Sequence, residues 1–257
     1  MYHFPPCPGH ALPDENLPFR IGPPALCCAA SPHRGAVSAA MPASKPVYWD
    51  VATSALAKRD AVLKRLIRAH PGVHLKSRGD PFTSLSRAIV GQQISVKAAD
   101  TIWRRFVATV APTTSARIAR KLDPRAVASQ QLPALRVCGL STRKAEYLRD
   151  LSTHFTSGRL DPKGWKQLDD EALIEALVAV KGIGRWTAEM FLIFHELRAD
   201  VLPVDDIGLQ RAIAVHYNRG ERLTPVALRE LAQRWQPYRS VATWYLWRSL
   251  DPIPVEY

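Results

Sequence analysis

Two adjacent carboxylates, Asp205 and Asp206, are the side chains best suited to electrostatic or acid–base catalysis. They stand in ADVLPVDDIGLQRAI, directly before an amphipathic run. A carboxylate held in a water-poor site stabilises positive charge that develops in a transition state, and it can also orient or deprotonate a water molecule. The alternative is that the acids cap the following helix, where acidic residues are favoured. The two residues alone leave both interpretations open.

A glycine-containing break between two helical patterns lies earlier in the chain. In DDEALIEALVAVKGIGRWTAEMFLIFHEL, residues 169–197, Gly182-Ile183-Gly184 interrupts the apolar periodicity and Arg185 opens the second run. Glycines accept positive φ and let the main chain approach a ligand, while free amides at a helix N-terminus bind phosphate. We expect Ile183 to fill the gap between the helices and Arg185 to add a salt-sensitive phosphate contact. An ordinary helix–helix turn is the alternative.

The string VKGIGRWTAEMF carries a family resemblance. It resembles the helix-hairpin-helix motif of the DNA glycosylase superfamily that includes endonuclease III, adenine glycosylase and DNA-3-methyladenine glycosylase II, and it is most similar to the last. The resemblance spans residues 48–250 and includes RWQPYRS, residues 234–240, which is similar to a C-terminal signature. It implies a two-lobed helical fold and hydrolysis of the N-glycosidic bond of alkylated purines such as 3-methyladenine, which initiates base excision repair. Family members usually have Pro where Lys181 stands, so this chain loses turn rigidity and gains a cation near the expected phosphate.

The resemblance assigns the catalytic role to Asp206, with Asp205 as the alternate. Bifunctional members carry a nucleophilic lysine two positions after the second hairpin glycine, and this sequence has Trp186 there. A monofunctional enzyme is therefore implied. Alkylated purines are electron-poor and often cationic, so an indole face attracts them. We expect Trp186 to face the base, and a core aromatic is the alternative.

The base pocket that the resemblance implies also contains Trp247, in SVATWYLWRSL, together with Met190 and Ile207. Met190 and Ile207 stand where the best-known bacterial enzymes have tyrosines. The less aromatic pocket predicts a narrower or different substrate range.

A loop before the hairpin resembles the wedge loop with which these enzymes open the duplex. It is Gly91-Gln92-Gln93-Ile94-Ser95, between two helical runs. Such enzymes extrude the target nucleotide and fill the gap that it leaves. Gln93 matches an inserted leucine of one branch, and Gln92 matches a gap-filling glutamine of others. Either can hydrogen-bond an orphaned partner base, so the identity of the wedge residue stays open, as does a plain connecting turn.

No cofactor is expected to be required. The family's hairpin often carries a structural monovalent cation on backbone carbonyls, and Val178, Val180 and Ile183 match those positions. Of the four cysteines only Cys138 lies in the part expected to fold, so neither a disulfide nor an iron–sulfur cluster is predicted. This argues against the endonuclease III and adenine glycosylase branches, which commonly carry such a cluster.

Helical patterns position these residues and cover the chain from residue 48 onward. ALAKRDAVLKRLIRAH, residues 55–70, is one amphipathic run. Further runs are expected at about 82–91, 95–110, 142–157, 170–180, 185–197, 206–217, 225–235 and 239–250. Four boundaries place a capping side chain before a proline at the first helical position: Asp80-Pro81, Asp123-Pro124, Asp161-Pro162 and Thr224-Pro225. No comparable alternating pattern occurs, so the predicted fold class is all-α.

Composition indicates the partner and the compartment. The chain has 257 residues and a formal net charge of +12, which favours a polyanionic partner, here duplex DNA containing damaged bases. Residues 1–44 are proline-rich without apolar periodicity and are predicted to be a disordered extension, with Met41 a candidate translation start; residues 45–257 form the glycosylase domain. Neither a membrane span nor a secretory signal is recognisable. We expect a cytoplasmic, nucleoid-associated monomer.

Two other functions fit the sequence. One is a glycosylase for oxidised, deaminated or mismatched bases. The other is a non-catalytic DNA-binding protein that uses the hairpin only to grip the backbone.

Overall fold

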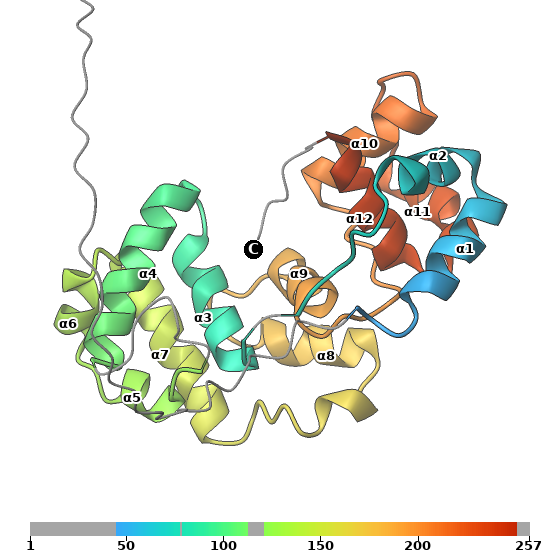
Figure 1. The fold of residues 1–257 in the computed structure, drawn as a ribbon. Helices are drawn as coiled ribbons and strands as arrows, with labels where there is room; N and C mark the ends of the chain where they lie inside the picture. The colour runs from blue at the N-terminus through green and yellow to red at the C-terminus, as the bar shows by residue number, and fades with distance from the viewer. Residues whose placement is uncertain (1–44, 78, 113–120, 251–257) are drawn as a thin grey trace, which may run out of the picture. The chain divides into compact units, whose positions relative to one another are not determined.

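All regular structure in the described residues is helical (Figure 1). The computed structural model describes residues 45–77, 79–112 and 121–250. The all-α prediction is confirmed. None of the helices in these ranges combines the length and apolar content that a membrane span requires. The predicted disordered extension, residues 1–44, lies outside the described residues, as does Met41.

The helices follow one another along the chain without any intervening strand in the described ranges. They are α1 (Trp49–Arg59), α2 (Ala61–Ala69), α3 (Pro81–Gly91), α4 (Val96–Val110), α5 (Pro124–Ala128), α6 (Leu132–Val137), α7 (Thr142–Thr156), the 3-10 helix η1 (Trp165–Gln167), α8 (Asp170–Val178), α9 (Arg185–Phe194), α10 (Ile207–Tyr217), α11 (Pro225–Ala232), the 3-10 helix η2 (Gln233–Trp235) and α12 (Arg239–Leu250).

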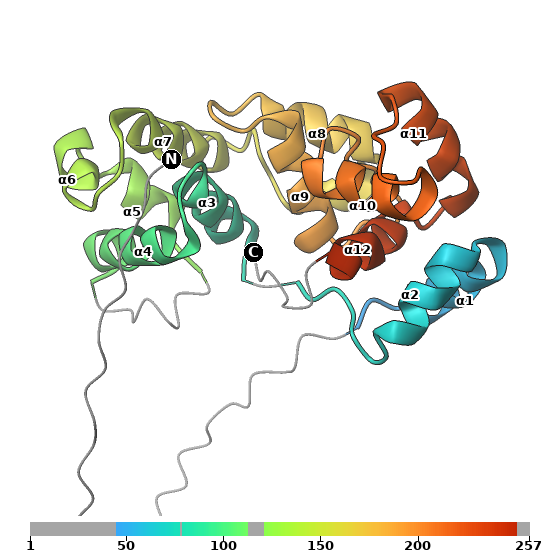
Figure 2. The same ribbon diagram turned by 90° about the horizontal axis from the view of Figure 1, so that it is seen from above.

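The helices pack in two groups, as the predicted two-lobed fold requires. In the first group α7 lies against α3, α5 and α6, and α4 packs on α3 and α6. In the second group α12 contacts α1, α2 and α10, so helices from both ends of the chain share one core (Figures 1 and 2). The rings of Trp49 in α1 and Trp244 in α12 meet edge to face, 5.4 Å between centroids. Helices α8 and α9 pack on each other, and α9 also contacts α3, which connects the hairpin to the first group.

Three of the four predicted helix starts are confirmed by a side chain that accepts a first-turn amide: Asp80, Asp123 and Thr224. The prediction at Asp161-Pro162 is wrong. The Asp161 carboxylate accepts the Lys163 amide within a turn, and the chain continues into η1 rather than an α-helix. Gly164 follows directly, and glycine is a poor helix former, so the turn does not propagate.

The amphipathic run predicted over residues 55–70 is two helices, which corrects the sequence interpretation. The backbone becomes extended at Asp60, with φ −139° and ψ 115°, and α2 begins at the next residue. Asp60 Oδ1 accepts the amides of Val62 and Leu63 at 2.9 and 3.1 Å. A residue that the sequence presents as part of a helix is therefore an N-cap, because its side chain replaces the missing first-turn acceptors.

The same carboxylate ties three separate elements together. Asp60 Oδ2 accepts the Tyr217 hydroxyl of α10 at 2.9 Å and Trp235 Nε1 of η2 at 3.0 Å. Asp60 is 4% exposed. Burying a carboxylate is unfavourable unless its oxygens are hydrogen-bonded, and here four donors satisfy it. Burial raises the pKa of Tyr217, and the nearby Asp60 raises it further.

Replacing Asp60 tests this network. Asp60→Ala leaves the Tyr217 hydroxyl and the Trp235 indole N–H without an acceptor and removes the α2 cap, so the free energy of unfolding should fall by about 3–5 kcal/mol. Urea unfolding followed by circular dichroism measures it. The control Asp100→Ala removes a half-exposed carboxylate paired with Arg87 and should lower it by less than about 1 kcal/mol. Equal effects of the two substitutions would contradict the network.

Candidate functional site

The Asp206 carboxylate is held by three donors at the start of α10. Oδ1 accepts the Leu209 amide at 2.6 Å and Trp247 Nε1 at 2.7 Å, and Oδ2 accepts Trp186 Nε1 at 2.9 Å. Asp206 is thus an N-cap and also the point where two tryptophans from α9 and α12 meet. The two interpretations left open by the sequence are compatible, because capping uses one oxygen and leaves the other directed to Trp186.

The two tryptophans differ in exposure. Trp186 is 42% exposed, so the alternative that it is a core aromatic is wrong. Trp247 is partly buried, and its ring stacks on Phe194 with 5.6 Å between centroids and 14° between planes. A Cβ on Gly208 would lie 3.2 Å from Trp247 Cδ1 and 3.1 Å from Asp206 Oδ1. The absence of a side chain at Gly208 therefore leaves room for the indole beside the carboxylate.

The remaining predicted pocket residues, Met190 and Ile207, lie on α9 and α10, and neither side chain hydrogen-bonds to Asp206. Met190 of α9 is partly buried against the core. Ile207 is the first residue of α10 and is 66% exposed. Their roles in a base pocket stay predictions. Asp205 is exposed, and its carboxylate makes no hydrogen bond within the described ranges.

The hairpin turn between α8 and α9 depends on a glycine. Gly182 has φ +83°, and a Cβ there would lie 2.1 Å from Cδ2 of the Tyr147 ring on α7. Gly184 has nothing within 4 Å of a built Cβ, so this side of the turn is open. Ile183 is 3% exposed, as its predicted place between the helices requires. Gly182 therefore allows α7 to approach the turn, whereas Gly184 lies on a side of the turn that has no neighbouring atom.

The turn contains backbone amides that remain available to a ligand. The N–H groups of Gly182, Gly184 and Arg185 donate to no acceptor in the part of the chain that the structure describes. Helix α9 begins at Arg185, so its positive dipole end adds to these donors. Such an arrangement binds phosphate.

The predicted cation site involves the inner carbonyls of the same turn. The Val180 carbonyl accepts the Ile183 amide at 3.1 Å, and a carbonyl oxygen retains a second lone pair. The residues therefore fit an oxygen-only site for a monovalent ion. Binding through Val178, Val180 and Ile183 stays a prediction.

Arg185, the predicted phosphate contact, is paired with two carboxylates. Its guanidinium donates to both oxygens of Glu171 at 2.9 and 2.6 Å and to Glu189 Oε1 at 3.0 Å. Burial raises the pKa of Glu189 to about 6, while Arg185 opposes that increase. The i,i+4 spacing of Arg185 and Glu189 could have predicted one of these pairs. The Arg185 side chain remains half exposed, and a phosphate would compete with Glu171 for it.

The predicted wedge loop, residues 91–95, is attached to the hairpin. Gln92 Nε2 donates to the Gly182 carbonyl at 2.8 Å. Lys144 Nζ on α7 donates to the carbonyls of Val90 and Gln92 at 2.9 and 2.7 Å. Burial lowers the pKa of Lys144. Gln93 is exposed and has φ +57°, and its side chain makes no hydrogen bond within the described residues, whereas the Gln92 side chain is bound to the hairpin.

Comparisons with known proteins identify the family to which the chain is similar. A family model described as HhH-GPD superfamily base excision DNA repair protein matches residues 86–237. DNA-3-methyladenine glycosylase 1 of Schizosaccharomyces pombe is 32% identical over 171 residues, which cover 66% of this chain and 72% of that protein. The crystal structure of a DNA-3-methyladenine glycosidase from Bacillus halodurans has a TM-score of 0.70 and 37% identity, and the match covers 77% of this chain and 88% of the other. A Schizosaccharomyces pombe 3-methyladenine DNA glycosylase in complex with abasic DNA has a TM-score of 0.65 and 30% identity, over 77% and 96% of the two chains.

Gly182 and Gly184 have different surroundings, so alanine substitutions at the two positions form a matched pair of variants. Gly182→Ala places a methyl group inside the Tyr147 ring and forces alanine to positive φ, so the free energy of unfolding should fall by about 2–4 kcal/mol. Gly184→Ala meets no neighbouring atom and should change it by less than about 1 kcal/mol. Thermal unfolding of both variants measures this. The turn is wrongly described if Gly184→Ala proves the more damaging substitution.

Proposed function

The chain belongs to the HhH-GPD superfamily of base excision DNA repair proteins, and we propose that it is a monofunctional DNA glycosylase for alkylated purines such as 3-methyladenine in duplex DNA. The observation that carries this proposal is the Asp206 carboxylate, bound by the indole N–H groups of Trp186 and Trp247. The names of the relatives, which are 3-methyladenine glycosylases, support the substrate class.

The catalytic step needs one carboxylate and one water molecule. The bond between the sugar C1′ and the purine nitrogen breaks with its electron pair going to the base, and an alkylated, cationic base leaves as a neutral molecule. Positive charge develops on the deoxyribose and is stabilised by Asp206. Water adds to C1′, and its proton passes to the carboxylate. Asp206 Oδ2 accepts a single hydrogen bond from the protein, so it is the oxygen with capacity for the water.

Base selection follows from the same cluster. Trp186 offers a half-exposed indole face, and electron-poor or cationic rings are attracted to such a face. Because both indole N–H groups bind Asp206, the rings and the carboxylate are fixed relative to one another. Met190 and Ile207 supply apolar but non-aromatic walls, which favours a narrower substrate range than a pocket with tyrosines at those positions.

DNA binding is assigned to the hairpin and the wedge loop. The amides of Gly182, Gly184 and Arg185 would hold one backbone phosphate, and the exposed Lys181 ammonium adds charge. A monovalent cation on the neighbouring carbonyls would increase the positive potential there. Gln93, free at the loop tip, would fill the gap left by the extruded base.

The proposal also covers the partner, the oligomeric state and the compartment. A net charge of +12 suits a polyanionic partner, here duplex DNA containing damaged bases. We propose that the active species is a monomer. We place its activity in the cytoplasm, on nucleoid DNA.

Asp206→Asn tests the catalytic assignment. Asparagine is as good an N-cap as aspartate, so the fold of α10 should be retained, while the charge that stabilises the sugar cation is lost. Release of 3-methyladenine from methylated duplex DNA should fall by roughly 10²–10³-fold. Binding to duplex DNA should stay the same or tighten, because a negative charge is removed. The control Asp205→Asn alters the neighbouring exposed carboxylate and should keep near wild-type release; the reverse result would move the catalytic role to Asp205.

Because residue 186 is a tryptophan and has no amine, the DNA strand is predicted to remain intact after the base is released. Trp186 cannot form a Schiff base with the sugar, so the protein should release the base and leave an intact abasic strand. Gel electrophoresis of the products should show cleavage only after alkali, and borohydride should trap no covalent complex. Nicking without alkali would contradict the monofunctional assignment.

A further inference from the structure

One face of α7 supports both proposed DNA-binding elements. Lys144, Tyr147, Asp150 and His154 are spaced by three, three and four residues, which places them on the same side of a helix. Lys144 binds two carbonyls beside the wedge loop, and Tyr147 lies against Gly182 of the hairpin. Asp150 and His154 continue this stripe toward the start of the hairpin turn.

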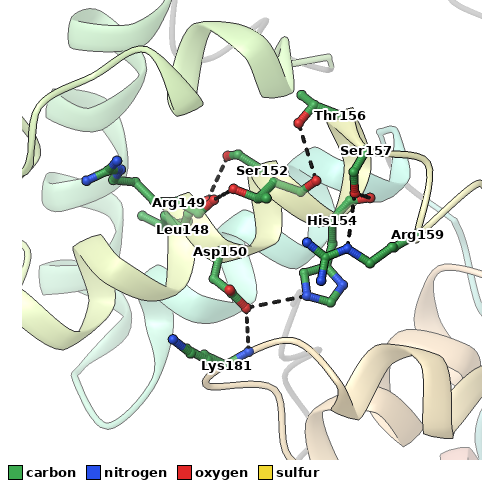
Figure 3. Close-up of polar contacts among 10 residues, drawn as sticks. Leu148, Arg149, Asp150, Ser152, His154, Thr156, Ser157, Arg159 and Lys181 are labelled. Carbon is green, nitrogen blue, oxygen red and sulfur yellow. Dashed lines mark hydrogen bonds and ion pairs between the residues drawn. The ribbon is translucent and has the colours of Figure 1, made fainter.

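Asp150 contacts the main chain of the hairpin directly. Its Oδ2 accepts the backbone amide of Lys181 at 2.9 Å, and His154 Nε2 lies 3.7 Å from the same oxygen (Figure 3). The hydrogen bond uses the main chain of Lys181, not its ammonium group. A proline at position 181 has no N–H and could not make this bond, whereas its ring would fix φ. Lysine at 181 leaves φ free and supplies the donor.

The geometry points to Asp150 as a positioning residue for the hairpin: its carboxylate fixes the turn through the Lys181 amide, a constraint that would be redundant with proline at position 181. This inference rests on the proposed function, because a fixed turn matters here through the phosphate that its outer amides bind. Asp150 holds the first residue of the turn, while the amides of Gly182, Gly184 and Arg185 donate to no acceptor within the described residues.

Electrostatic repulsion alone predicts the opposite effect on DNA binding when Asp150 is removed. A carboxylate near a phosphate-binding turn repels the DNA backbone, so its removal should tighten binding. If Asp150 instead orders the turn, its removal weakens binding, because the hairpin amides must then be ordered when the phosphate binds. The sign of the change distinguishes the two effects.

The test is a double-mutant cycle on the full chain, with the dissociation constant for a duplex containing a stable abasic-site analogue as the readout. Asp150→Ala should weaken binding by roughly 10-fold, the size expected for a hydrogen bond to a charged group. In the Lys181→Pro background the same substitution should change binding by less than about 2-fold, because the donor is gone and the ring fixes the turn. In the Lys181→Ala background, which removes the ammonium but retains the amide, the roughly 10-fold effect should persist.

Further variants separate positioning from general stability. Asp150→Asn retains an acceptor oxygen and should bind within about 2-fold of wild type. Glu146→Ala removes an exposed acid of the same helix and should not weaken binding. In base release, Asp150→Ala should raise KM and leave kcat within about 2-fold, because the Asp206 cluster is untouched. Thermal unfolding gives a second readout, since the Tm decrease caused by Asp150→Ala should be smaller in the Lys181→Pro background.

Three results would overturn the inference: tighter binding by Asp150→Ala, an equal loss in the Lys181→Pro background, or a fall in kcat with KM unchanged. Failure of the proposed function looks different. In that case the wild-type protein itself releases no alkylated purine, whatever the Asp150 variants do to binding of the abasic duplex.

Discussion

Three helices of the C-terminal half of the chain converge on the carboxylate of Asp206. Its own helix, α10, uses one oxygen as a cap, while α9 and α12 each bring an indole N–H to it. For these bonds to form, the hairpin must set the direction of α9 and the second helical group must set that of α12. The Asp206 carboxylate, which is the proposed catalytic group, is thus fixed in position relative to the two tryptophans that are proposed to recognise the base. The fixed charge needs little reorganisation when a cation develops beside it, which is the condition for strong electrostatic stabilisation.

The hairpin and the wedge loop form a second constrained unit. Gln92 joins the loop to the Gly182 carbonyl, and Lys144 holds the loop from α7. Gly182 itself must lack a side chain because Tyr147 occupies that space. A displacement of the loop therefore strains the turn, and a displacement of the turn strains the loop. Two elements proposed to touch different parts of a duplex are connected by short, direct contacts rather than through the distant core.

Some of this could be predicted from the sequence, and the rest could not, for a physical reason. Helix starts such as Asp80-Pro81 and the hairpin glycines are local patterns, and Trp186 and Asp206 stand at short, fixed distances from them along the chain. Asp60 is different: it reads as part of an amphipathic run, and its partner Tyr217 is 157 residues away. Asp150 likewise acts through a bond to the Lys181 amide, which lies 31 residues later in the chain. One-dimensional periodicity reports burial and helix direction, but it contains no information on which distant donor a polar side chain meets.

Helix α12 lies outside the segment that the family model matches, yet it contributes a residue to the proposed site. The segment matched by the family model, residues 86–237, contains Asp206 and Trp186, whereas Trp247 lies beyond it on α12. Helix α12 rests on α1 and α2, which precede that segment. The proposed catalytic carboxylate and one wall of the proposed base site therefore have separate structural supports. Sequence drift in the two ends of the chain can reshape what is recognised while the charge at the centre of the site is preserved.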